Sequence, residues 1–364
     1  MDADPSARSA APGEPGARYE RRGAAGFILL DRPKTLNALT PAMVGAIAEA
    51  LDAFERDARV ARVVVASAGG RAFCAGGDIR LIYQQGKQGD HAAQLAFWRE
   101  EYRLNRRIKR YSKPYVALID GVVMGGGVGL CIHGSHRAAS ERCVLAMPEV
   151  GIGFFPDVGA TFALPRLPHR IGAYLAATGL RAEAGDVVAL GLAQSYVPSA
   201  RVGELARALE EREPVEAILA RFAAPPPAST IMAEAAHIES WFSRLDRQAI
   251  LDGLAAAADE GSLFARAALA AMREKSPTSQ AIALRQMALG AELSFEEAMG
   301  LEFRIVSRIC RGHDFYEGVR AAIIDKDQSP GWRPGPGETL DERAIAAYFA
   351  PLGAAELTFP EAAR

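Results

Sequence analysis

A run of glycines at residues 124–134, MGGGVGLCIHG, places the strongest constraint on how this chain folds. It follows the apolar stretch PYVALIDG at 114–121, which predicts a buried strand. Glycine permits dihedral angles and close approaches that a Cβ atom forbids, and the start of a helix exposes unpaired backbone N–H groups. The run therefore indicates either a helix packed closely on a sheet or a backbone site for an anion. Its spacing fits neither the dinucleotide-binding fingerprint nor the P-loop.

A second glycine corner occurs earlier in the chain. RAFCAGGDI at 71–79 follows the β-branched run ARVVVASA at 61–68 and carries bare amides at Gly76 and Gly77. Two such corners can each direct one N–H group at a single oxygen atom, which is the arrangement of an oxyanion hole. Removal of one such donor typically costs about 2.7–4 kcal/mol of transition-state stabilisation. The second corner therefore favours the anion site over close packing alone.

Strands and helices alternate through the N-terminal half. GFILLDRP at 26–33 predicts a strand that ends at a proline, and Thr40 followed by Pro41 predicts a helix that continues to about Arg56. The apolar spacing of 95–111 predicts another helix. This alternation is typical of an α/β protein in which most strands pair in parallel.

Three regions are expected along the chain. Residues 1–17 are rich in alanine, proline and glycine and predict a disordered tail. The α/β core is expected to cover 18–222. Residues 223–364 then form a helical region and tail that open with the proline run AAPPPAS, and helices are predicted from Ser276 and from Ser294.

The composition excludes several kinds of partner. The formal net charge of the 364 residues is −2 and consecutive basic residues occur only in pairs, so the sequence predicts no nucleic-acid surface. No uncharged apolar stretch reaches the roughly 18 residues of a membrane span. The four cysteines form no CxxC pair, which is typical of reduced thiols. Because the N-terminal segment also lacks an arginine-rich amphipathic pattern, we expect a cytoplasmic protein.

Three motifs, LDRPKTLNAL, FCAGGDI and DGVVMGGGVGL, together resemble the crotonase (enoyl-CoA hydratase/isomerase) superfamily. The resemblance implies a spiral of ββα units followed by a C-terminal helical region. It also implies a coenzyme A (CoA) thioester whose carbonyl oxygen meets two backbone amides, here those of Gly77 and Gly126. The CoA needs no separate cofactor because it is part of the substrate, and a homo-oligomer is compatible with the family. The implied CoA-binding residues are Lys34, Leu36, Ala38, Ala75, Gly76, Asp78 and Ile79.

The resemblance also shows where an acidic group is absent. Hydratases of the superfamily use two glutamates, and the position of the first is occupied here by Gly129. The second corresponds to Glu149 in AMPEVGIGFFPDVGATFALPRL, a segment that also contains Asp157. Addition of water to an alkene needs proton donation and water activation together, so the loss of one carboxylate argues against hydration.

Longer patterns at 99–105, 146–167 and 314–332 resemble one branch of the superfamily, which hydrolyses short 3-hydroxyacyl-CoA thioesters. That resemblance implies substrate contacts from Glu101, Glu149 and Asp157, in addition to Gly126. Glu149 and Asp157 are the expected catalytic residues.

Several alternatives remain open from the sequence. Glu149 could attack the thioester carbon directly or activate a water as a general base. A hydratase or isomerase reaction and a non-catalytic CoA-binding protein are the competing functions. We expect no metal site, because no carboxylate at ligand spacing joins His133 and His136.

Overall fold

The computed structural model describes residues 16–359, which divide into two compact units. The first unit consists of 16–78, 104–145 and 182–232, and the second consists of 79–103, 146–181 and 233–359. The units are interleaved along the chain, so their division differs from the single boundary predicted at the proline run. The tail predicted at 1–17 lies outside the described residues as far as residue 15, whereas Ala17 already belongs to a strand.

The first unit contains two sheets. The larger has the strand order β1-β2-β3-β5-β7-β10, and the smaller has the order β4-β6-β8-β9. In the larger sheet only β1 runs antiparallel to its neighbour, as expected for an α/β protein. The strands are β1 (Ala17–Arg22), β2 (Ala25–Leu30), β3 (Arg62–Ser67), β4 (Ala72–Cys74), β5 (Tyr115–Ile119), β6 (Val122–Met124), β7 (His136–Ala139), β8 (Val144–Ala146), β9 (Ala182–Glu183) and β10 (Ser195–Tyr196).

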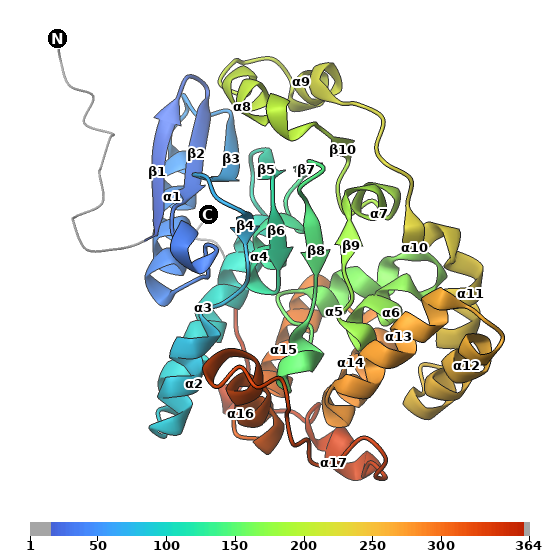
Figure 1. Cartoon of the computed structure of the whole chain (residues 1–364). Coiled ribbons are helices and arrows are strands. Elements are labelled where there is room, and N and C mark those ends of the chain that lie inside the picture. Colours follow the sequence, from blue (N-terminus) through green and yellow to red (C-terminus); the bar gives the residue numbers. More distant parts are fainter. Residues whose placement is uncertain (1–15, 360–364) are drawn as a thin grey trace. The chain divides into compact units, whose positions relative to one another are not determined.

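Helices cover both faces of the larger sheet. Alternate residues of a strand point to opposite faces, and in β2 Phe27 belongs to a core cluster with residues of α8 and α9, whereas Gly26 lies against Phe54 of α1. Figure 1 shows α1 beside β1 and β2. The helical segments of this unit are η1 (Pro33–Thr35), α1 (Pro41–Arg56), α4 (Gly126–Cys131), α7 (Ala184–Ala189), α8 (Ser199–Ala208), α9 (Val215–Phe222) and most of α10 (Thr230–Ala233).

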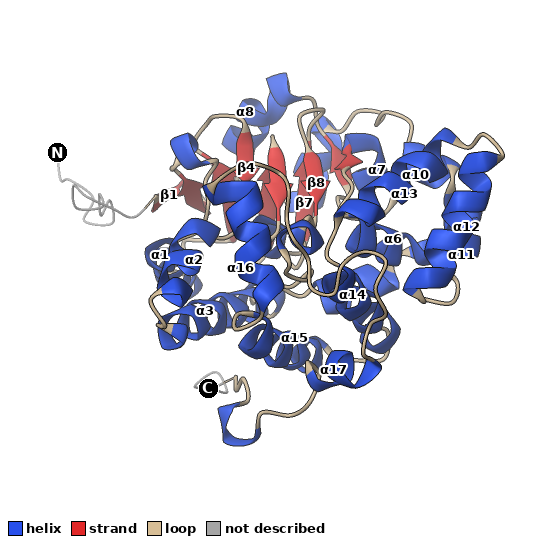
Figure 2. Cartoon of the chain, turned by 60° about the horizontal axis from the view of Figure 1, so that its bottom comes forward, coloured by secondary structure: helices blue, strands red, loops and turns tan. Residues whose placement is uncertain are grey.

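The second unit is built mainly from helices, which Figure 2 colours blue. Helix α3 (His91–Lys109) belongs to it as far as Arg103. No helix of the described residues is both long and apolar enough to cross a membrane. The other helical segments are α2 (Ile79–Lys87), η2 (Glu149–Ile152), α5 (Ala160–Ala163), η3 (Leu164–Arg166), η4 (Pro168–Arg170), α6 (Ile171–Thr178), α11 (Ala235–Phe242), α12 (Arg247–Asp259), α13 (Leu263–Glu274), α14 (Pro277–Gly290), α15 (Phe295–Ile309), α16 (His313–Val319), η5 (Arg320–Ile324), α17 (Glu342–Ala347) and η6 (Gly353–Ala355).

The predicted helix starts are confirmed by their caps. The Thr40 hydroxyl accepts a hydrogen bond from the Met43 N–H, and Pro41 is the first residue of α1. Ser276 caps α14 in the same way, while Ser294 caps α15 through a capping box with Glu297. A side-chain oxygen at this position satisfies a backbone N–H that the helix itself leaves unpaired, which is why these residue types could be identified from sequence.

The glycine run opens the helix α4 after the predicted strand β5, as expected, although the short strand β6 between them was not predicted. One of its glycines is required by close packing. A Cβ atom added at Gly127 in α4 would lie only 2.2 Å from the carbonyl oxygen of Cys74 in β4. No other residue type fits this contact without moving the backbone. The packing interpretation of the run is therefore correct for Gly127.

We expect Gly127→Ala to destabilise the protein by about 1–3 kcal/mol, because the added methyl group overlaps a backbone carbonyl. Gly45→Ala in α1 is the matched control, since an added Cβ there meets nothing within 4 Å. Alanine has the higher helix propensity, so the control should stabilise the protein by about 0.5–1 kcal/mol. Urea unfolding of both variants measures these changes. Equal effects at the two positions would contradict the packing interpretation.

Candidate active site

The two glycine corners lie next to each other in the first unit. A Cβ atom at Gly76 would be 3.3 Å from the Met124 carbonyl oxygen and 3.7 Å from the Gly126 nitrogen. Gly76 and Gly125 also have positive φ angles, of 108° and 47°, which side chains strongly disfavour. Glycine is thus needed at each corner, and the corners bring the backbone of the two motifs into one place.

The predicted CoA-binding residues of this unit occupy two segments that are hydrogen-bonded to each other. The Ala75 N–H donates to the Leu36 carbonyl at 3.0 Å, and the Leu39 N–H donates to the Gly76 carbonyl at 2.8 Å. Lys34 is exposed within the short helix η1. The two sequence motifs therefore form one surface.

The other two predicted CoA-binding residues, Asp78 and Ile79, follow Gly77 in the sequence. Asp78 forms an ion pair with Arg32 at 3.3 Å. Ile79 begins α2 and belongs to the second unit. The Asp78 N–H also donates to the Leu39 carbonyl at 2.8 Å, so this residue joins the two segments through both its side chain and its backbone.

Asn37 holds this surface together, a role that the sequence analysis missed. Its side-chain amide donates to Ser67 Oγ and to the carbonyl oxygens of Ala72 and Phe73, at 2.9, 3.1 and 3.0 Å. Its φ of 57° is left-handed, a conformation that asparagine tolerates better than most residues. The one sequence signal was an asparagine within the otherwise apolar run LNAL.

The three predicted carboxylates are buried together in the second unit. Glu101 lies on α3, Glu149 is the first residue of η2, and Asp157 lies in the loop before α5. Their exposed fractions are 3%, 7% and 4%. Among the described residues, no lysine, arginine or histidine is among the groups that shift the pKa values of these three carboxyls.

Burial and mutual repulsion make these groups weak acids. Loss of solvation raises the pKa of Glu149 well above its usual range, and the charges of Asp157 and Glu101 raise it further. Burial also raises the pKa of Asp157, to about 7, against the opposing effect of a hydrogen bond from Tyr102. The pKa of Glu101 is raised by burial and by the charge of Asp157. The three carboxyls therefore interact as one electrostatic cluster.

Two atoms of the cluster have no hydrogen-bond partner. Glu149 Oε2 and Glu101 Oε1 are buried and unsatisfied, whereas Asp157 Oδ2 accepts a hydrogen bond from the Tyr102 hydroxyl at 2.8 Å. A buried carboxylate oxygen without a partner is costly, so such atoms in a native protein generally indicate a place for a ligand or a water. Glu149 and Glu101 therefore retain free acceptors, while Tyr102 fixes the orientation of Asp157.

Glu302 is a fourth carboxylate of this cluster, and the sequence analysis did not identify it. It lies on α15, and its charge raises the pKa of Glu101. A sequence signal was present, because Glu302 has helical spacing with the apolar residues Ala298 and Ile305 on the buried face of α15. A lone glutamate on an apolar helix face is unusual unless its charge is accommodated.

Other polar residues are poor candidates for chemistry. All four cysteines are free and buried, and burial raises the pKa of the Cys131 and Cys143 thiols to about 12, which suppresses the reactive thiolate. His136 is hydrogen-bonded to Ser135 and to Glu216. In the range 16–359 no three histidine, cysteine or acidic residues are grouped so that they could hold a metal ion.

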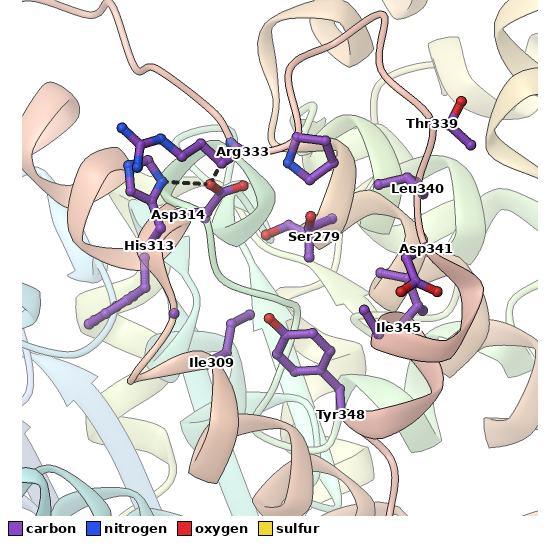
Figure 3. Close-up of a pocket in the computed structure, with 16 residues that line it drawn as sticks. Ser279, Ile309, His313, Asp314, Arg333, Thr339, Leu340, Asp341, Ile345 and Tyr348 are labelled. Atoms are coloured by element: carbon purple, nitrogen blue, oxygen red, sulfur yellow. Dashed lines mark hydrogen bonds and ion pairs between the residues drawn. The ribbon is translucent and has the colours of Figure 1, made fainter.

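A cavity of about 280 Å³ lies elsewhere in the second unit (Figure 3). Its wall includes Ser279, Asp314 and Tyr348, and it reaches Gly153 of the loop that follows Glu149. None of the predicted carboxylates lines this cavity, so it is separate from the acidic cluster.

This fold, with its two glycine corners, matches a known family. The enoyl-CoA hydratase/isomerase family matches residues 25–349, and the chain belongs to it. The chain is 43% identical to "3-hydroxyisobutyryl-CoA hydrolase, mitochondrial" of Xenopus tropicalis, over 93% of this chain and 89% of the relative. It is 41% identical to the human protein of the same name, over 93% of this chain and 90% of the relative.

Two solved structures with other names are also similar to this chain. A carnitinyl-CoA dehydratase from Mycobacterium thermoresistibile has a TM-score of 0.90 and 38% identity, with 95% of this chain and 99% of that chain covered. An enoyl-CoA hydratase from Rhodobacter sphaeroides has a TM-score of 0.87 and 41% identity, with 95% and 100% covered. The predicted crotonase-type fold is therefore confirmed.

The names of the relatives contradict one expectation from the sequence. The frog and human hydrolases are described as mitochondrial, whereas a cytoplasmic protein was expected. That expectation depended on a missing arginine-rich pattern in a short N-terminal segment. The comparison rests on nearly the whole chain, and it makes the cytoplasmic assignment wrong.

The raised pKa of Asp157 predicts how stability depends on pH. Its ordinary pKa is 3.8 and its native pKa is about 7, so between these values the native state holds a proton that the unfolded state has released. The contribution of Asp157 to the free energy of unfolding should therefore fall as pH rises from about 4 to about 7 and level off above that range. Asp157→Asn should flatten this dependence. Unfolding at a series of pH values measures both, and parallel curves would contradict the proposed burial of an ionising carboxyl.

Proposed function

We propose that this chain hydrolyses the thioester of a short 3-hydroxyacyl-CoA, with 3-hydroxyisobutyryl-CoA as the substrate, as a step in valine breakdown. The observation that carries the proposal is the buried carboxyl cluster, whose members Glu149 and Glu101 keep unsatisfied oxygen atoms. The identity of 41–43% to hydrolases of that name supports the choice of substrate. The reaction requires no cofactor beyond the CoA that the substrate carries.

The backbone amides of Gly77 and Gly126 are the proposed donors to the thioester oxygen. The proximity of the Gly76 turn to the Gly126 nitrogen supports this assignment. When the carbonyl carbon is attacked, negative charge develops on that oxygen, and fixed N–H groups stabilise it without reorganising. Backbone donors also leave room for the bulky thioester, which explains the lack of side chains at both corners.

Glu149 is the proposed reacting carboxylate. In the covalent route its oxygen bonds to the carbonyl carbon and the carbon–sulfur bond breaks, so that CoA leaves as a thiolate and a mixed anhydride remains. Water then opens the anhydride, which releases the hydroxy acid and regenerates the carboxylate. In the alternative route Glu149 removes a proton from the attacking water. Both routes require ionised Glu149, whose raised pKa delays ionisation and makes the carboxylate more basic.

Asp157 and Glu101 are the proposed binding groups for the acyl 3-hydroxyl. Glu101 Oε1 is an unsatisfied acceptor, and Tyr102 holds Asp157 in one orientation. A hydroxyl group donates one hydrogen bond, which these carboxyls can accept in a buried environment. This pairing accounts for a preference for 3-hydroxyacyl chains.

Hydration or dehydration is the alternative, because the two structural relatives carry names of that kind. In this chain Gly129 lies buried within α4 and has no side chain to supply the second carboxylate. A panel of acyl-CoA substrates separates the two functions. Release of free thiol supports hydrolysis, whereas hydration of crotonyl-CoA without thiol release supports the alternative. A chain that binds CoA but is inert to every substrate would be a non-catalytic CoA-binding protein.

Glu149→Gln tests the reacting carboxylate. The amide has nearly the same shape but cannot act as a nucleophile or a base, so we expect thiol release from 3-hydroxyisobutyryl-CoA to fall by at least about a thousandfold. Circular dichroism should show an unchanged fold. Turnover within about tenfold of the wild type would refute the assignment.

Asp157→Asn tests selectivity. Hydrogen bonds to charged groups contribute about 1.5–3 kcal/mol, so kcat/KM should fall by about 10- to 100-fold more for 3-hydroxyisobutyryl-CoA than for isobutyryl-CoA. The second substrate lacks the hydroxyl and serves as the control. If both substrates lose activity equally, Asp157 does not recognise the hydroxyl group.

A further inference from the structure

Glu302 is hydrogen-bonded to the loop that contains Asp157. Its Oε2 accepts a hydrogen bond from the Gly159 N–H at 2.8 Å, and its Oε1 accepts one from the Thr161 N–H at 2.9 Å. The side chain is completely buried. Because both oxygens accept, the geometry suits an ionised carboxylate, which has acceptors only.

The loop that is hydrogen-bonded to Glu302 contains two residues with left-handed backbone conformations. Val158 has a φ of 52°, and Gly159 has a φ of 87°. Left-handed geometry is rare for a β-branched residue and persists only where the surroundings impose it. The two bonds to Glu302 directly follow this strained residue, so they are placed to hold Asp157 in position.

A second residue holds the same loop without charge. The Gln286 side-chain amide on α14 donates to the Pro156 carbonyl at 3.0 Å and to Thr161 Oγ1 at 2.7 Å. It is completely buried, like Glu302. Purely mechanical support of the loop is thus already supplied by a neutral side chain.

We infer that Glu302 is a positioning residue whose carboxyl group holds the loop around Asp157 through two hydrogen bonds and, when ionised, acts electrostatically on the neighbouring Glu101. The inference rests on the proposed hydrolysis, and it assigns Glu302 no contact with the substrate. Its task is to set the position and the protonation of other groups.

The electrostatics of the cluster agree with this role. Burial and the charge of Asp157 raise the pKa of Glu302 to about 8, although its hydrogen bonds from Gly159 and Thr161 oppose the shift. In turn, the charge of Glu302 raises the pKa values of Glu101 and Tyr102. The titratable groups of this neighbourhood come from α3, η2, the loop before α5, and α15. They are Glu101, Tyr102, Glu149, Asp157 and Glu302.

The test compares Glu302, which can carry a charge, with the neutral Gln286, since both residues are hydrogen-bonded to the loop. In Glu302→Gln the charge is lost and one N–H group of the loop faces an amide NH2, so kcat should fall by about tenfold. Loss of the Glu302 charge should lower the pKa of Glu101, which that charge raises. The acid limb of the pH profile of kcat should therefore move to lower pH by about one unit, the scale on which such groups couple. Gln286→Met removes the two hydrogen bonds of the neutral side chain, so it should lower the free energy of unfolding and leave the acid limb of the kcat profile unmoved.

Glu302→Asp completes the set because it keeps the charge but shortens the side chain. It should retain the acid limb of the wild type while losing some of kcat. An unmoved limb in Glu302→Gln, or an equal shift in Gln286→Met, would overturn the inference. Wild-type protein that releases no thiol from any 3-hydroxyacyl-CoA would instead refute the proposed function.

An infrared titration gives an answer that depends neither on activity nor on a Glu302 variant. In the wild type, the absorption of protonated carboxyls should decrease as pH rises through the pKa of Glu302, which is about 8. In Asp157→Asn the remaining titration should shift to lower pH, since the neighbouring charge has been removed. An identical titration near pH 8 in both proteins would show that the two groups are not coupled and would overturn the inference.

Discussion

The structure depends on the burial of several carboxyl groups whose pKa values no basic group of residues 16–359 is found to lower. Burial of a charge is costly, and like charges raise the cost further, so proteins generally avoid both. Here the cost is limited by hydrogen bonds from Tyr102, Gly159 and Thr161 and by the retention of protons at neutral pH. A cluster of this kind lowers stability, and such a loss is expected where it serves chemistry.

The glycine corners differ from the carboxyl cluster because they present backbone groups instead of side chains. They lack side chains, which in the proposed function lets the backbone approach the thioester, and Gly127 permits α4 to pack on β4. Gly126 and Gly127 are adjacent but have different tasks, because one belongs to the proposed oxyanion site and the other to close packing. The proposed function therefore assigns charge stabilisation to the main chain and proton transfer to buried carboxyls.

Local features of this protein could be predicted from the sequence, whereas distant pairings could not. Thr40, Ser276 and Ser294 begin helices because capping depends on the next few residues. Glu101, Glu149 and Asp157 were identified through their resemblance to family motifs, and the structure brings them together. Glu302 and Asn37 were missed because their partners lie far away in sequence; Glu302 and its partner Gly159 are separated by 143 residues.

The pH dependence of kcat/KM for 3-hydroxyisobutyryl-CoA tests the central claim most directly, since it reports the ionisation of the groups that perform the reaction. Burial raises the pKa of Glu149 well above its usual range and that of Asp157 to about 7, so hydrolysis should be lost well above the pH at which a solvated carboxyl gains its proton. Full activity maintained down to about pH 5, near the ordinary range of a solvated carboxyl, would contradict the account.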